Sequence, residues 1–371
     1  MMRLNLFLIR AHNQMDTLIP YQAGMSTQSL QNIASDTIIK LASNENPLGM
    51  SPKAKVAMLK DINDTYLYPE KMGNTLHALA KHLNVSAKQC ILGNGSENII
   101  AMLIQIFNRP ENHFLIPQYA FSAYRINAKA HNASIKIIPT PNYQVNVKDI
   151  LSLVNPNTAL VFIDNPNNPT GHYLTHNEIL SLLKKLPAST LLVLDEAYYE
   201  FAKNTNDYPN ALALQKDYPN LVIIRTFSKV YGLAGLRVGY GIAHTDIIEL
   251  LNRVRFPFNV SSLALSAAQA ALDDNKFMEQ SIANNTASIL AFQACFKQLG
   301  IDAYPALGNF ITIDLKQNAS DFFQFMLEQG IILRPLNAYE LPNHIRISMG
   351  RQEQNALAIQ YINHYFGKKT L

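Results

Sequence analysis

The chain of 371 residues has only two cysteines, no tryptophan and no long apolar run. Cys90 and Cys295 are far apart and lack the spacing of metal ligands, so we expect buried thiols in a reducing compartment, without a disulfide framework. The N-terminal apolar segment is short, is interrupted by Asn5 and is followed by no small-residue cleavage site, unlike a signal peptide. No stretch reaches the ~20 apolar residues of a membrane span. These absences predict a cytoplasmic protein with no membrane partner.

Charged residues are also few, at 16% of the chain, and the 31 basic and 27 acidic side chains leave a net charge of +4. The basic residues are scattered without interleaved aromatic side chains, which predicts no nucleic-acid partner. Among the 10 histidines, His172 and His176 have the spacing of one helical turn but no third ligand nearby, so no metal site is predicted. What remains is a globular composition, 48% apolar, in a chain long enough to bury a sizeable core.

Short apolar runs recur through the middle of the chain, at 113–117, 135–139, 159–163, 191–194 and 221–225. They lack strict alternation, as expected of strands that are buried on both faces. Helical patterns separate these runs, and one begins with the capping box of Thr175 and Glu178. This alternation predicts an α/β fold with a mostly parallel sheet and helices on both faces.

The pattern changes after Pro257, where long helical segments are followed by strands that alternate with shorter helices. The change predicts three regions along the chain. They are an N-terminal arm over 1–40, a large α/β domain over 41–260 and a smaller C-terminal α+β domain over 261–371.

Polar residues follow three successive predicted strands. Asp164, Asp195 and Thr226 come at equal intervals of about 30 residues, the length of one βαβ unit. Because ligands of open α/β sheets bind beyond the carboxyl ends of the strands, we expect the chemistry at this edge. A carboxylate such as Asp195 at the end of a buried strand calls for a cationic partner.

Two segments have the residue types of a phosphate site. Lys229 stands in TFSK, and Arg237 follows in a glycine-rich stretch, so hydroxyl groups and a guanidinium come together. The segment 93–98, GNGSEN, leads into an apolar helix whose free N–H groups suit an anion, although it lacks the third glycine of a dinucleotide fingerprint. Each segment alone is explained as well by turn chemistry or a surface lysine. Together, a lysine, a buried carboxylate and a phosphate cradle indicate pyridoxal phosphate.

The sequence resembles the pyridoxal-phosphate-dependent aminotransferases of fold type I and, within them, the histidinol-phosphate aminotransferases. The motifs appear in the family's order from about residue 20 to the end of the chain. They are KLASNENPLG (40–49), YLYPE (66–70), GNGSEN (93–98), NPNNPTG (165–171), DEAY (195–198), RTFSK (225–229), GLAGLRVGY (232–240), GIILR (330–334) and HIRIS (344–348).

The resemblance implies a role for each matching residue around the cofactor. Lys229 would bind the cofactor and then move the substrate proton, and Asp195 would keep the pyridine nitrogen protonated. Tyr198 and Asn168 would hydrogen-bond the oxygen of the ring, and Tyr119 would stack on the ring. The phosphate ligands would be Ser96, Glu97, Thr226, Ser228, Arg237 and, from the neighbouring subunit of a homodimer, Tyr68, with Tyr66 as the alternative.

For the substrate, the resemblance implies that Arg346 binds the α-carboxylate and that Arg334 binds a distal phosphate or the second carboxylate of glutamate. Asn168 would also contact the substrate, and Tyr21 would cover it as part of a lid.

The implied reaction converts histidinol phosphate and 2-oxoglutarate to imidazole-acetol phosphate and glutamate, a step of histidine biosynthesis. Its mechanism would be ping-pong through pyridoxamine phosphate. Two alternatives keep the cofactor: transamination of aromatic amino acids, and decarboxylation of a phosphorylated amino acid such as threonine phosphate. A third, a ligand-sensing domain on an aminotransferase fold, is disfavoured because Lys229 is intact and residues 1–40 are too short for a helix-turn-helix module.

Overall fold

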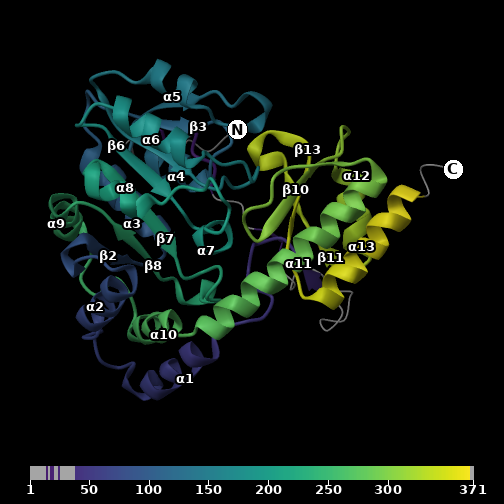
Figure 1. The fold of residues 1–371 in the computed structure, drawn as a ribbon, viewed down its shortest axis with the longest axis horizontal. Helices are drawn as coiled ribbons and strands as arrows, with labels where there is room; N and C mark the ends of the chain where they lie inside the picture. Colours follow the sequence, from purple (N-terminus) through teal and green to yellow (C-terminus); the bar gives the residue numbers. More distant parts are fainter. Residues whose placement is uncertain (1–13, 16, 21–23, 26–37, 368–371) are drawn as a thin grey trace, which may run out of the picture.

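A seven-stranded sheet forms the centre of the larger of two bodies in the computed structural model, which describes residues 14–15, 17–20, 24–25 and 38–367 (Figure 1). The strand order is β2-β8-β7-β6-β5-β3-β4, and within this sheet only β8 runs antiparallel to its neighbours. The strands are β2 (Cys90–Gly93), β3 (His113–Pro117), β4 (Ser134–Ile138), β5 (Thr158–Asp164), β6 (Leu191–Asp195), β7 (Leu221–Thr226) and β8 (Gly239–Ile242). The predicted α/β fold with a mostly parallel sheet is confirmed.

Successive side chains of the central strands enter two different apolar cores. Val161 and Leu192 lie in one core, whereas their neighbours Phe162 and Val193 lie in the other, because side chains alternate across a strand. Apolar runs without alternation are therefore what this sheet requires. The edge strand β4 is the exception, since it is mostly exposed.

Helices cover both faces of the sheet, as predicted (Figure 1). The first face packs against α1 (Pro52–Asp61), α2 (Met72–Leu83), α5 (Val147–Leu153), α6 (His176–Lys185), α8 (Ala211–Asp217) and α10 (Ser262–Leu272). The second packs against α3 (Ser96–Phe107), α4 (Ser122–Ala130) and α9 (Thr245–Val254). Helix α6 begins with the predicted capping box, since Thr175 accepts a hydrogen bond from the backbone of Glu178 and the Glu178 side chain accepts one in return.

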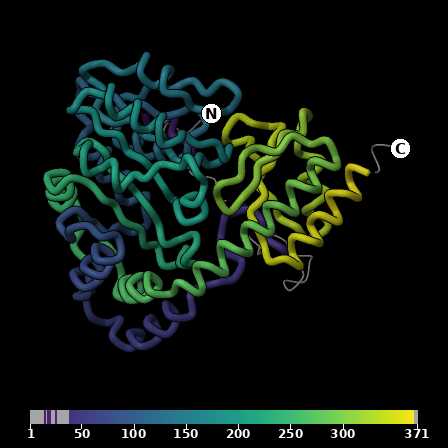
Figure 2. The backbone as a smooth tube through the Cα atoms, in the orientation of Figure 1, coloured from purple at the N-terminus to yellow at the C-terminus, as the bar shows by residue number. Residues whose placement is uncertain are grey.

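The smaller body has an antiparallel sheet in the order β12-β13-β10-β9. Its strands are β9 (Asp302–Ala303), β10 (Phe310–Asp314), β12 (Arg334–Leu336) and β13 (Leu341–Ser348), and its helices are α11 (Asn275–Leu299), α12 (Ser320–Glu328) and α13 (Gln352–Gly367). A parallel pair, β1 (Ile39–Lys40) and β11 (Ile331–Ile332), brings the segment before the large sheet to this body (Figure 2).

The boundary between the bodies differs from the predicted one near residue 261. Leu265 of α10 lies in the core of the large body, whereas Phe292 and Phe296 of α11 lie in the core of the small one. The division therefore falls within α11, the long helix that leads from one body to the other (Figure 1). Leu41 also belongs to the small core, although the sequence pattern assigned it to the large domain. Apolar periodicity shows that a helix is packed but not which body it packs against.

Both cysteines are buried free thiols, as predicted, and burial raises the pKa of Cys90 to about 12. Among the described residues, no helix is both long enough and apolar enough to cross a membrane.

Candidate active site

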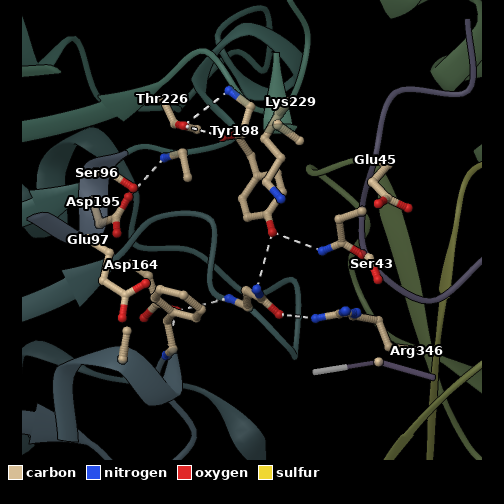
Figure 3. Close-up of a pocket in the computed structure, with 18 of the residues that line it drawn as sticks. Ser43, Glu45, Ser96, Glu97, Asp164, Asp195, Tyr198, Thr226, Lys229 and Arg346 are labelled. Carbon is tan, nitrogen blue, oxygen red and sulfur yellow. Dashed lines mark hydrogen bonds between the residues drawn. The ribbon is translucent and has the colours of Figure 1, made fainter. Parts of the chain in front are cut away.

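A cavity of about 280 Å³ opens at the carboxyl ends of β5, β6 and β7 (Figure 3). Most residues expected at the site line it. They are Ser96, Glu97, Asn168, Asp195, Tyr198, Thr226, Ser228, Lys229, Arg237, Arg334 and Arg346. The strands of the large body contribute one side of the cavity, and β12 and β13 of the small body contribute the other.

Asp195 ends β6 with a buried carboxylate that accepts two hydrogen bonds. The Tyr124 hydroxyl donates to Oδ2 at 2.9 Å, and the Ala197 N–H donates to Oδ1 at 3.1 Å. Burial nevertheless raises the pKa of Asp195 to about 6. No ion pair forms with this carboxylate within the described part of the chain, so the site fits a ligand that brings a positive charge, such as a protonated pyridine nitrogen.

Lys229 stands just beyond β7, with Nζ 5.7 Å from the centroid of the Tyr198 ring. Burial, and after it the charge of Arg346, lower the pKa of Lys229 to about 8. A lysine with a lowered pKa has a larger neutral fraction near neutral pH, which suits both attack on a carbonyl and proton transfer.

The start of α3 and the loop after β7 together form an anion cradle. Gly95 precedes the helix with a φ of +76°, and a Cβ there would lie 2.6 Å from Nη2 of Arg237, so the guanidinium rests directly on the glycine backbone. No side chain caps this helix, which leaves its first N–H groups available. The hydroxyls of Thr226 and Ser228, 3.0 Å apart, also line the cavity. Backbone N–H groups, hydroxyls and a guanidinium are the ligands that a phosphate requires.

A chain of hydrogen bonds connects the two bodies across the cavity (Figure 3). The Tyr198 hydroxyl oxygen accepts from Nδ2 of Asn44 at 2.8 Å and from Nδ2 of Asn168 at 3.2 Å. Oδ1 of Asn168 in turn accepts from Nη1 of Arg346 at 2.5 Å, and Nη2 of Arg346 donates to the Ala42 carbonyl at 2.9 Å. Burial raises the pKa of Tyr198, so its hydroxyl stays protonated at neutral pH.

The two substrate arginines expected from the sequence lie at paired positions of neighbouring strands. Arg334 of β12 is directly opposite Arg346 of β13 in the antiparallel register. Residues paired in this way project from the same face of a sheet. Both line the cavity, so two guanidinium groups serve one side of it.

Two predicted residues, Tyr119 and Tyr68, do not line this cavity. Tyr119 lines a smaller neighbouring cavity, where its ring is 5.6 Å from that of Tyr143, and Phe121 lines the active-site cavity in its place. Tyr68 is 75% exposed and stacks on Phe258 at 4.6 Å. Tyr21 lies outside the described residues.

Other residues of the site were given no role from the sequence. Asp164 is buried, accepts hydrogen bonds from the backbone N–H groups of Phe121 and Asn168, and has its pKa raised by burial to about 7. The position of Asp164 at the end of a strand could have identified it as a site residue. The NENPLG motif could have identified Asn44 in the same way. The partnership of Tyr124 with Asp195 joins residues 71 positions apart, and nothing in the local sequence indicates it.

A buried ion pair joins the ends of β6 and β7. Arg225 of β7 donates from Nε at 2.9 Å and from Nη2 at 2.8 Å to Oε2 of Glu196, which follows β6. The guanidinium carbon lies 3.4 Å from the centroid of the Tyr199 ring. This pair joins the turn that carries Asp195 to the strand that leads to Lys229.

Comparison with known proteins assigns the family. The model of "Aminotransferase class I and II" matches residues 36–362. Histidinol-phosphate aminotransferase 1 of Mannheimia succiniciproducens is 42% identical over 351 residues, which cover 94% of this chain and 96% of that protein. Histidinol-phosphate aminotransferase 2 of Legionella pneumophila strain Philadelphia 1 is 42% identical over 361 residues, which cover 96% of this chain and 97% of that protein.

A solved structure of histidinol-phosphate aminotransferase from Sinorhizobium meliloti, in complex with pyridoxal-5'-phosphate, has a TM-score of 0.87. It covers 97% of this chain and 98% of its own, and at 24% identity it shows the shared fold. The chain therefore belongs to the class I and II aminotransferases, and it is a pyridoxal-phosphate-dependent transaminase of fold type I.

Proposed function

We propose that this transaminase transfers the amino group of histidinol phosphate to 2-oxoglutarate, a step of histidine biosynthesis. The observation that carries the proposal is the pairing of Arg334 with Arg346. Histidinol phosphate has a phosphate ester on the carbon next to the amine carbon, where an amino acid has its carboxylate. A phosphate dianion offers more charge and one more oxygen than a carboxylate, which suits two guanidinium groups. The names of the 42% identical relatives support the same substrate.

The cofactor supplies an electron-withdrawing ring that stabilises negative charge at the amine carbon of the substrate. Around it, Asp195 would hold the ring nitrogen protonated, because this buried carboxylate has no cationic partner among the described residues. Ser96, Ser228 and Arg237 would hold the phosphate, with Thr226 and the backbone of Glu97 beside them. Phe121 would provide the stacking surface first assigned to Tyr119.

Lys229 is the covalent attachment point and the base of this mechanism. Once the substrate amine displaces it, the neutral lysine would take the proton from the amine carbon and return it on the cofactor side. Its pKa of about 8 leaves a useful fraction of neutral amine at neutral pH. Tyr198, held by Asn44 and Asn168, would fix the orientation of the ring oxygen.

A homodimer belongs to the same proposal. Large apolar side chains are exposed in α1 and in the segments near Tyr68 and Phe258, and a monomer seldom leaves so many of them in water. They are Val56, Leu59, Ile62, Tyr66, Leu67, Tyr68, Phe256 and Phe258. A second copy of the chain would cover them and receive Tyr68 at its phosphate cradle.

The dimer is tested by Tyr68→Phe, which keeps the apolar ring and removes the hydroxyl. We expect the variant to remain a dimer in sedimentation velocity and to bind the cofactor several-fold more weakly, because one phosphate contact is lost. The matched control is Tyr66→Phe, which should bind the cofactor normally. The reverse ranking would transfer the role to Tyr66, and a monomeric wild type would contradict the dimer.

The substrate is tested by single-turnover reactions without a keto acid, comparing histidinol phosphate with phenylalanine. Arg334→Met should slow the reaction of histidinol phosphate at least tenfold and that of phenylalanine less than about twofold, since phenylalanine has one carboxylate for Arg346. The matched control is the exposed Arg351→Met. Faster conversion of phenylalanine than of histidinol phosphate by the wild type would make the protein an aromatic aminotransferase. Release of carbon dioxide from threonine phosphate would make it a decarboxylase.

A further inference from the structure

A second cavity, of about 300 Å³, lies beside the active-site cavity. The two cavities share Arg334 and Tyr339 in their walls. Helix α4 forms one side of the second cavity, the segment 18–20 forms an apolar side, and the turn η8 (Asn337–Tyr339) with Glu340 closes it. A group that extends from the active site past Arg334 would therefore enter this space.

The second cavity has an excess of positive charge. Arg125 and Lys129 are one helical turn apart on α4 and so project from the same face of the helix. With Arg334 they bring three cationic groups, and Glu340 is the carboxylate that lines the cavity with them. Within the described residues, no ion pair joins Glu340 to Arg125 or Lys129.

The contacts of Arg125 leave part of its guanidinium for a ligand. Nη2 donates to the Gln118 carbonyl at 2.5 Å and to the Pro117 carbonyl at 3.4 Å, but Nε is buried and has no acceptor among the described residues. Burial lowers the pKa of the guanidinium, and Glu340 and Tyr339 act in the opposite direction. No hydrogen bond of the described residues uses Nη1, so this nitrogen could donate to a ligand oxygen in the cavity.

A transaminase that serves both proposed substrates has to bind charge in two different places. Histidinol phosphate has its one anionic group next to the amine carbon, where the paired arginines lie. Glutamate and 2-oxoglutarate also have a carboxylate next to the reacting carbon, and a second carboxylate two methylene groups further out. This second carboxylate requires a cation that histidinol phosphate does not use.

We propose that the second cavity is the subsite for the distal carboxylate of the dicarboxylic substrate, with Arg125 as its ligand and Lys129 adding positive charge. Arg125 and Lys129 are then specificity-determining residues for the acceptor, and Arg334 lies at the junction of the two subsites. The inference rests on the proposed function only in taking 2-oxoglutarate as the acceptor.

The test measures binding of two unreactive acids to the cofactor-loaded enzyme by isothermal titration calorimetry. Glutarate has the two carboxylates of 2-oxoglutarate at the same spacing, and pentanoate lacks the distal one, so the ratio of their affinities isolates the subsite. Arg125→Met should reduce this ratio about tenfold, and Lys129→Met should reduce it about threefold. Glu340→Gln should increase it, because a repelling carboxylate is removed. Arg351→Met, away from the cavity, should leave it unchanged.

Lys129→Met is the control for a purely structural effect. Arg125 also donates hydrogen bonds to the carbonyls of Pro117 and Gln118, whereas no ion pair of the described residues involves the Lys129 ammonium. An unchanged ratio in both variants would overturn the inference. So would an equal weakening of glutarate binding and pentanoate binding.

Single-turnover rates with histidinol phosphate should stay within twofold in both variants. If these rates fall instead while glutarate binding holds, the cavity serves the phosphate and the acceptor assignment is wrong. Failure of the wild type to react with histidinol phosphate would count against the proposed function and not against this subsite.

Discussion

The two ends of the active-site cavity are built in different ways. At the cofactor end, the groups are strand termini, a helix start and short side chains, packed so closely that Arg237 rests on the backbone of Gly95. At the substrate end, the groups are the long side chains of Arg334 and Arg346 on the small body. Closely packed groups at a sheet edge hold one ligand in one place, whereas the two guanidinium groups on the small body can adjust to two substrates of different shape.

The largest effect is expected from a substitution at the cofactor end of the cavity. Lys229→Ala should lower the single-turnover rate with glutamate by at least about 10⁴-fold, because the proposed attachment point and the proposed base would both be lost. The exposed Lys216→Ala is the matched control and should react like the wild type. A Lys229→Ala rate within tenfold of the wild type would mean that another group moves the proton.

A smaller effect tests how rigid the cradle is. Gly95→Ala places a Cβ 2.6 Å from Nη2 of Arg237 at a φ of +76°, so the guanidinium has to move away. We expect the dissociation constant of the cofactor to rise about tenfold or more, measured by titration of the apoprotein. Gly73→Ala in α2, where a Cβ meets no atom within 4 Å, is the control and should bind the cofactor normally. Equal affinities would show that the cradle is as adjustable as the substrate end.

A third effect concerns the stability of the apoprotein. Burial raises the pKa of Asp195 from 3.8 to about 6 in the folded state. The folded state therefore binds more protons than the unfolded chain between these values, so stability falls as the pH rises through this window, and the whole penalty is present above about pH 6. Asp195→Asn has no such titration.

The unfolding free energy of Asp195→Asn relative to wild type should therefore increase by about 2 kcal/mol between pH 4 and pH 8. Urea unfolding of both apoproteins at a fixed protein concentration measures the difference. The exposed Asp217→Asn should show no pH-dependent difference. A constant difference between Asp195→Asn and wild type would show that the carboxylate titrates normally in the folded chain.

The sequence predicted those parts of the site in which several site residues lie in one short segment. Lys229 with its hydroxyls, and the glycine turn before Ser96, each lie within a few residues of one another, so local patterns were enough. The contact of Tyr124 with Asp195 and the replacement of Tyr119 by Phe121 depend on how separate segments pack. A small change in the conformation of the loop around Tyr119 and Phe121 decides which aromatic ring faces the cavity. The pattern of apolar residues in the sequence contains no information about it.

Which body a helix or strand belongs to also depends on contacts between segments that are distant in the sequence. Helix α10 packs on α1 and α2, and β1 pairs with β11, so the cores exchange segments across the predicted boundaries. The strands of the large sheet were predicted well because burial on both faces leaves a signal in each strand by itself.

The pairing of Arg334 with Arg346 has a consequence for the durability of the enzyme. Like charges at directly opposite positions of neighbouring strands repel each other, so an anion bound to both arginines would stabilise this part of the small sheet. A ligand that binds only the folded state protects it in proportion to its concentration. A cell well supplied with the proposed phosphorylated donor would thus keep more of this enzyme folded.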